Sequence, residues 1–232
     1  GVEDFHPLSQ AGRWNGAGFV NDGYTAATID AADSSDASFI DEASPNGARA
    51  NQGSYGGTAE ASRSPAAPAS ALVVSAFLNS ASVSYSAAAS DGYRVEASTT
   101  SNFSTTRLSS STNNAALLVL SPQGLLPNTT YYPRAGAVWG DYFAAVNTVP
   151  ASTSTLAAQP APAIPVFGAV YVTSMTLQWQ VNGNPVDVTT YSVVLSTGAA
   201  YPNAFAGNSA LVSTAPAGAS PAASFTGLAA NT

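Results

Sequence analysis

The chain has 232 residues, 45% of them apolar and only 8% charged, and it carries a net charge of −7 with no cysteine. This length predicts one or two domains, and the lack of cysteine excludes disulfides and thiolate chemistry. An acidic chain without lysine or a basic patch argues against nucleic-acid binding, and no apolar run approaches the ~20 residues of a membrane span.

The first 64 residues differ chemically from the rest, because nine of the thirteen acidic residues of the chain lie there. Their Gly, Asn, Asp and Ser content favours turns, and their larger apolar residues are scattered. We therefore expect residues 1–64 to be an irregular acidic N-terminal segment with short strands at most. Contact with other parts, rather than a core of its own, would order it.

An acidic cluster within this segment is the only candidate metal site. Asp30, Asp33 and Asp36 follow one another at intervals of three, with Asp41 and Glu42 close behind. Ca²⁺ prefers several oxygen ligands from a flexible acidic loop. The spacing is not that of an EF-hand, so a calcium site and a solvated acidic loop both stay open.

Catalytic chemistry finds no support in the sequence. His6 is the sole histidine, and neither a nucleophile elbow nor a phosphate-binding or dinucleotide-binding loop is present. Asp91 and Glu96 are interpreted as ordinary surface residues. We expect a protein that is not an enzyme and that has no cofactor, apart from the possible Ca²⁺.

Two stretches rich in Pro and Ala, residues 64–68 and 159–165, divide the remainder. Proline fixes φ and lacks an N–H, so both stretches are predicted as linkers or strand entries. The resulting segments are 1–64, 65–158 and 159–232. Short runs of strict alternation, bounded by turn residues, predict half-buried strands at 82–85, 93–97 and 118–120.

The third segment repeats the second. Residues 176–179 match 82–85 at an offset of 94, 190–193 match 92–95 at an offset of 98, and Leu228 matches Leu125. A period near one hundred residues with many short strands is typical of a β-sandwich domain. The fold class expected is all-β.

Each of these units resembles a fibronectin type III module. The resemblance rests on a proline-led first strand, an apolar-x-aromatic second strand (Val83 and Tyr85; Leu177 and Trp179), a Tyr-x-Val third strand (Tyr93 and Val95; Tyr191 and Val193), and Leu125-x-Pro127-x-Thr129-x-Tyr131. It implies tandem β-sandwiches over about 65–232, with Tyr131 at the corner before strand F. Val83, Tyr85, Tyr93, Val95, Leu120, Leu125 and Tyr131 should be buried.

By this resemblance the second module is incomplete. The corner motif starts again at Leu228 and stops at Asn231 and Thr232, so strands A, B, C, C′ and E are expected without F and G. Tyr191, Val193 and Leu195 would then lack a partner strand on one side, and Trp179 would lack cover. An exposed apolar edge of this kind is an aggregation site unless something covers it.

Two aromatic residues and two sequons suggest further partners. Trp14 and Trp139 could stack on a sugar or a protein, or could fold back onto their own domain. Asn102-x-Ser104 and Asn128-x-Thr130 fit the N-glycosylation pattern, which is common by chance. Glycans are therefore possible partners.

The function predicted is that of a structural subunit of an extracellular or cell-surface filament, tube or layer. Copies of the chain would be joined by strand complementation, with Trp14, Phe19 and Val20 in the donor and Tyr191, Val193 and Leu195 in the acceptor. Low charge and a surface of small residues favour dense self-packing. The alternative is a fragment of a larger secreted modular protein, an adhesin or the spacer modules of a carbohydrate-active enzyme. The start at Gly1 favours a mature secreted form over an artificially trimmed chain.

Overall fold

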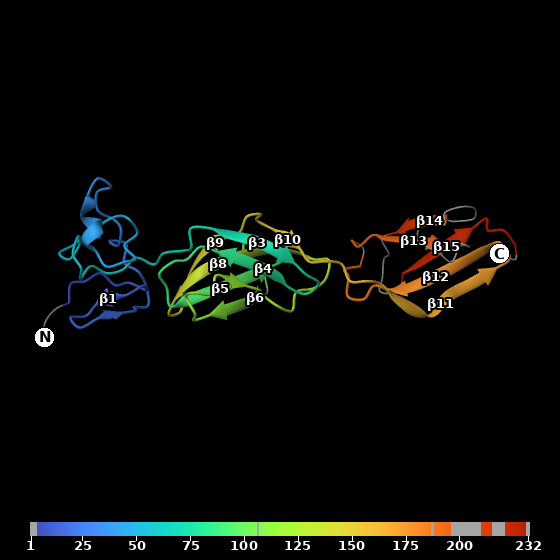
Figure 1. The fold of residues 1–232 in the computed structure, drawn as a ribbon, viewed down its shortest axis with the longest axis horizontal. Coiled ribbons are helices and arrows are strands. Elements are labelled where there is room, and N and C mark those ends of the chain that lie inside the picture. Colours follow the sequence, from blue (N-terminus) through green and yellow to red (C-terminus); the bar gives the residue numbers. More distant parts are fainter. Residues whose placement is uncertain (1–3, 106, 187, 196–209, 215–220, 231–232) are drawn as a thin grey trace. The chain divides into compact units, whose positions relative to one another are not determined.

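The computed structural model consists of β-strands and one short 3-10 helix (Figure 1). It describes residues 4–105, 107–186, 188–195, 210–214 and 221–230. The chain folds as two units: Gly1–Gly124 with Thr130–Thr153, and Leu125–Thr129 with Ser154–Thr232. In the described part of the chain, no helix is long and apolar enough to cross a membrane.

The N-terminal segment has little regular structure, as its composition predicts. It contains a two-stranded hairpin of β1 (Arg13–Trp14) and β2 (Phe19–Val20) and the 3-10 helix η1 (Ala37–Asp41). The Asp36 side chain caps η1 by accepting a hydrogen bond from the Ser38 N–H, which is the usual role of Asp at a helix start.

Buried polar side chains, rather than apolar ones, hold this segment together. Glu42 is 5% exposed, and its Oε1 accepts hydrogen bonds from the backbone N–H groups of Asn51 and Gly57, both at 2.8 Å. The Asn51 side chain accepts from the N–H of Asp30 and donates to the carbonyl of Ser62. Side chains thus satisfy backbone groups that a helix or a sheet would otherwise pair.

The first β-sandwich packs a three-stranded sheet against a larger one (Figure 1). The smaller sheet has the order β3 (Ala71–Ala76), β4 (Ala81–Tyr85), β7 (Val119–Leu120). In the larger sheet β5 lies between β6 and β8, and β8 also pairs with β9 and β10. These strands are β5 (Gly92–Ser98), β6 (Arg107–Thr112), β8 (Thr130–Trp139), β9 (Tyr142–Asn147) and β10 (Thr153–Ser154).

Alternation along the strands places the predicted side chains in the core of this sandwich. All seven residues expected there, from Val83 to Tyr131, are buried, with exposed fractions between 0% and 7%. The rings of Tyr85 and Tyr93 lie 4.7 Å apart. The Tyr85 hydroxyl donates to the carbonyl of Leu117, and burial raises the pKa of Tyr85 to about 12.

The second unit also contains two sheets. One has the order β11 (Ala161–Tyr171), β12 (Ser174–Gln180), β15 (Ala222–Thr226), and the other pairs β13 (Tyr191–Leu195) with β14 (Ala210–Thr214). In order along the chain these are the predicted strands A, B, C, C′ and E. The motif residues Asn231 and Thr232 lie outside the described residues.

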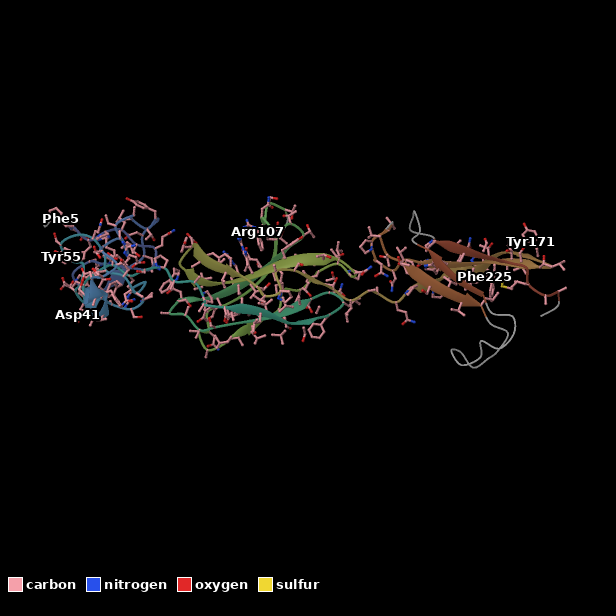
Figure 2. All side chains as sticks on the ribbon, turned by 90° about the horizontal axis from the view of Figure 1, so that it is seen from above. Phe5, Asp41, Tyr55, Arg107, Tyr171 and Phe225 are labelled. Carbon is pink, nitrogen blue, oxygen red and sulfur yellow. The ribbon has the colours of Figure 1, made fainter. Side chains whose placement is uncertain are left out.

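The expected lack of cover over Trp179 is wrong. Trp179, Tyr191 and Val193 are only 5%, 7% and 8% exposed, because β13 lies over β12 and β15 and the three side chains pack against Ala223 and Phe225. Phe225 points into this core, whereas Tyr171 at the end of β11 is 71% exposed (Figure 2). The second unit is therefore closed over Trp179 but open along its edges.

Candidate partner-binding groove

Among the described residues, strand β13 has a neighbour on one edge only, whereas its counterpart in the first sandwich has neighbours on both. There, β5 pairs with β6 on one side and with β8 on the other. Within the described residues β13 pairs with β14 alone, in the register Tyr191↔Thr214 to Leu195↔Ala210. The second edge of β13 thus presents backbone groups of the kind that can pair with an added strand.

A groove of about 310 Å³ runs beside this strand. Aromatic and aliphatic side chains form most of its wall. It is lined by Pro160, Leu177, Trp179, Tyr191, Ser192, Val193 and Val194. Four of these seven residues belong to β13, so the groove follows the strand edge. An extended apolar segment matches such a surface in both shape and chemistry.

Hydrogen bonds from Asn184 hold Tyr191 in place at this groove. The Asn184 side chain exchanges two hydrogen bonds of 2.8 Å with the backbone of Ala158 and donates to the carbonyl of Val181 at 2.9 Å. It also lies 3.3 Å from the Tyr191 hydroxyl. The Tyr191 ring packs 5.6 Å from that of Trp179. The wall of the groove is therefore preformed.

Trp179 carries a polar atom that the second unit leaves unsatisfied. Its Nε1 is buried and has no hydrogen-bond partner among the described residues. A buried donor without an acceptor costs about 1–3 kcal/mol. Trp179 therefore lowers the stability of the second unit by about this amount as long as no acceptor reaches its Nε1.

The predicted donor residues lie in the N-terminal hairpin. Trp14 pairs with Phe19, and Arg13 pairs with Val20. The guanidinium of Arg63 lies 3.8 Å from the centre of the Phe19 ring. The segment is therefore paired with itself rather than extended and free, and it would have to open before it could serve as a donor.

The acidic cluster has three separate local roles. The Asp30 carboxylate accepts a hydrogen bond from the Ser64 hydroxyl, Asp33 accepts from Ser35, and Asp36 caps η1. Across the described ranges, no three His, Asp or Glu side chains are grouped as metal ligands. The structure therefore does not bring Asp30, Asp33 and Asp36 together as a calcium site.

Asp30 should make the stability of the N-terminal segment depend on pH. Burial raises the pKa of Asp30 above its ordinary value of 3.8, and Glu42 raises it further, while Ser64 and Arg49 oppose the shift. The folded state therefore binds the proton more tightly than the unfolded state. The resulting stabilisation is complete below the unfolded pKa and is lost as the pH rises through the folded pKa.

Hydrogen exchange in wild type and Asp30→Asn, compared at each pH, would measure this effect. Asparagine keeps an oxygen that can accept from Ser64 but does not titrate. We expect the protection of amides 28–51 in wild type to fall relative to Asp30→Asn as the pH rises. Parallel pH profiles for the two proteins would contradict the assignment.

The two tryptophans considered as sugar or protein contacts differ in exposure. Trp139 is 5% exposed at the end of β8, so it folds back onto its own sandwich, and Trp14 is half-buried. Of the two sequons, Asn102 lies exposed in the loop after β5. The Asn128 side chain donates to the Thr189 hydroxyl at 2.9 Å, so its amide is already engaged.

Sequence reasoning missed a second cluster, on the outer face of the larger sheet in the first sandwich. Glu96, expected as an ordinary surface residue, is 5% exposed and lies beside three arginines. Arg94 and Glu96 are two residues apart and so share one strand face. Because the chain has few charged residues, an arginine and a glutamate at this spacing could have predicted an ion pair on that strand face.

No family model and no curated protein matches this sequence. Solved structures with a similar fold include a two-domain fibronectin type III segment of chicken tenascin (15% identity, covering 71% of this chain and 85% of that chain, TM-score 0.46). A computationally redesigned β-sandwich protein is 22% identical, covers 40% of this chain and 93% of its own, and has a TM-score of 0.33. The FN5 domain of Drosophila Lar is 20% identical, covers 37% of this chain and 97% of its own, and has a TM-score of 0.30. The strand orders of the described residues make this an all-β protein built of β-sandwich modules.

Proposed function

We propose that this protein is a structural subunit of an extracellular assembly, in which a strand from a second copy fills the groove beside β13. The observation that carries the proposal is the apolar groove along the edge of β13 that no described strand pairs with. The first sandwich supplies the comparison, because β8 occupies the corresponding place beside β5 and alternates buried and less buried residues.

Energetics favour filling the groove. Each aliphatic or aromatic side chain that an added strand buries contributes roughly 1.5–3 kcal/mol, and its backbone groups complete the ladder of β13. The net stability of a small domain is only ~5–15 kcal/mol. A strand that buries a few such side chains would therefore change the stability of the second unit by a large fraction.

The N-terminal hairpin is the proposed donor. Residues 13–20 contain two aromatic rings and a valine, and a two-stranded hairpin alone is at best marginally stable in water. Opening it would therefore cost little compared with strand addition. Donation from the N-terminal segment of one copy to the second unit of the next is heterologous, so it builds a filament unless the rotation closes a ring.

Composition supports an extracellular location and a non-catalytic role. Charged residues make up only 8% of the chain, against roughly 25% in ordinary globular proteins. Few charges leave a surface of small polar residues, which suits dense packing between copies. The groove itself is lined by apolar side chains and one serine and has no titratable group other than Tyr191.

A charge on the groove should prevent assembly. Val194→Lys places an ammonium group on the β13 edge, where an added strand would have to desolvate it. Val188→Lys is the matched control, because Val188 is 70% exposed and does not line the groove. Light scattering after gel filtration and electron microscopy should show extended assemblies for wild type and Val188→Lys, and no extended assemblies for Val194→Lys.

Removal of residues 1–22 tests the donor separately. The shortened chain should not polymerise alone but should cap wild-type assemblies, since it keeps the acceptor groove. If Val194→Lys assembles like wild type, or if wild type stays monomeric at all concentrations, strand complementation between copies is wrong. The chain would then be better described as spacer modules of a larger secreted protein.

A further inference from the structure

The outer face of the larger sheet in the first sandwich carries an organised group of arginines. Glu96 on β5 lies at its centre, and its Oε2 accepts hydrogen bonds from Nε of Arg134 at 2.9 Å and from Nη2 at 2.6 Å. Nε of Arg94 lies 3.2 Å from Oε1 of Glu96, and Nη1 of Arg107 lies 4.0 Å from Oε2. We call Arg94, Arg107 and Arg134 the guanidinium face.

Aromatic rings fix the orientation of two of these groups. The guanidinium carbon of Arg94 lies 4.1 Å from the centre of the Phe143 ring, and that of Arg134 lies 3.9 Å from the centre of the Phe103 ring. Arg134 also lies 5.3 Å from Phe143. Stacking on aromatic rings preorganises guanidinium groups while their N–H edges stay available for hydrogen bonds.

The backbone is shaped to permit this stack. A Cβ on Gly136 would collide with the Phe143 ring, so glycine is what allows the ring to lie across β8. Phe103 has a φ of +56°, a left-handed conformation that non-glycine residues rarely adopt. Strained residues of this kind cluster at functional sites, and here the strain places a buried ring beneath Arg134.

The charges of the guanidinium face are not balanced by Glu96, the one carboxylate with which these arginines form described ion pairs. Three guanidinium groups surround one carboxylate, which leaves a net charge of about +2 in a chain that carries −7. Nε of Arg94 is buried and faces Glu96, so only the outer N–H groups of Arg94 could meet a further ligand. Arg107 has a half-exposed side chain that projects from the sheet (Figure 2). The face can therefore accept a further anionic group.

The same chain contains a surface of opposite charge. Asp33, Asp36 and Asp41 are exposed around η1 and lie next to Ile40, which is 71% exposed. Hydrogen bonds from Ser35 and Ser38 lower the pKa of Asp33 and Asp36, so both stay ionised well into the acidic range. We call Asp33, Asp36 and Asp41 the acidic edge.

We propose that the guanidinium face of one copy binds the acidic edge of a second copy. This contact rests on the self-association proposed above but uses other residues than the groove. A copy of the chain is proposed as the partner because the chain itself presents an exposed, compact group of carboxylates of complementary charge. Complementary charge of this kind sets the register and the association rate of an interface.

The test uses the full chain with the groove already blocked by Val194→Lys, so that strand addition cannot contribute. Sedimentation velocity in 20, 150 and 500 mM NaCl should show a weak association that decreases with salt, because salt screens charges. In this background, Arg107→Gln should weaken the association about tenfold. Gln123→Glu changes the net charge equally at an exposed site outside the face, and it should have little effect.

A second experiment reverses one charge on each of the two surfaces. Arg107→Glu and Asp36→Arg should each fail to associate alone, and an equimolar mixture of the two should associate again. Equal association of the Arg107→Gln and Gln123→Glu proteins, or a mixture that does not associate, would overturn the proposal. The proposal would also be overturned if the protein bound heparin at 20 mM NaCl, lost that binding in Arg107→Gln, and showed no association between copies. If Val194→Lys assembled like wild type, that result would contradict strand addition at the groove but not the contact between the guanidinium face and the acidic edge.

Discussion

Replacing Glu96 with alanine is expected to lower the free energy of unfolding of the first sandwich by about 3 kcal/mol. Removal of one partner from a buried ionic group typically costs ~3–5 kcal/mol, because the remaining charges are left uncompensated. Here three guanidinium groups would lose their common carboxylate. The lower end of the range applies because Arg94 and Arg107 are partly exposed and can turn toward water.

Urea unfolding combined with hydrogen exchange of the β5, β6 and β8 amides would measure this loss. Glu96→Gln should be less destabilising, since its amide oxygen can still accept from Arg134. Arg107→Ser should change stability by under about 1 kcal/mol, because an exposed pair at 4.0 Å contributes little. Similar losses for Glu96→Ala and Arg107→Ser would show that the cluster does not stabilise the sheet.

Tyr93→Ala is expected to cost about 3–5 kcal/mol, the usual range for an aromatic residue removed from a core. Tyr93 is 1% exposed, and its ring packs against Tyr85. Its hydroxyl accepts from the N–H of Ala88 at 2.8 Å and donates to the carbonyl of the same residue at 2.7 Å. The side chain therefore fills the core and also anchors the loop between β4 and β5.

Two further variants separate these contributions. Tyr93→Phe keeps the ring but removes both hydrogen bonds to Ala88, so a loss of about 1–3 kcal/mol is expected. Tyr191→Phe is the equivalent change in the second unit, where the hydroxyl lies near Asn184 and Val181 at 3.3 and 3.4 Å. These longer contacts predict a smaller effect. A loss in Tyr191→Phe as large as in Tyr93→Phe would contradict this comparison.

Periodicity and the repeated motifs were sufficient to predict both sandwiches. A strand with one face on the core buries every second side chain, and this alternation predicted the buried residues Val83, Tyr85, Tyr93 and Val95. The same spacing identified the second unit, in Leu177, Trp179, Tyr191 and Val193. The resemblance of the two units also predicted that β13 lacks one neighbour, and within the described residues β13 pairs with β14 alone.

Long-range pairing could not be predicted from local patterns. The hairpin of β1 and β2 pairs the aromatic residues that looked suitable as a free donor. The burial of Trp179 depends on how β13 lies over β12 and β15. The guanidinium face joins residues from three strands, β5, β6 and β8, and its aromatic partners come from β9 and the loop after β5. Only the pairing of these strands shows that Glu96 is buried.

The polar interior of the N-terminal segment has a thermodynamic consequence. Heat-capacity change and denaturant sensitivity both scale with the surface exposed on unfolding, and apolar surface dominates the heat-capacity term. This segment relies on Glu42, Asn51 and Ser62 and buries few large apolar side chains. Its opening therefore contributes little to either quantity, so it can loosen over a wide temperature range while the sandwiches melt sharply.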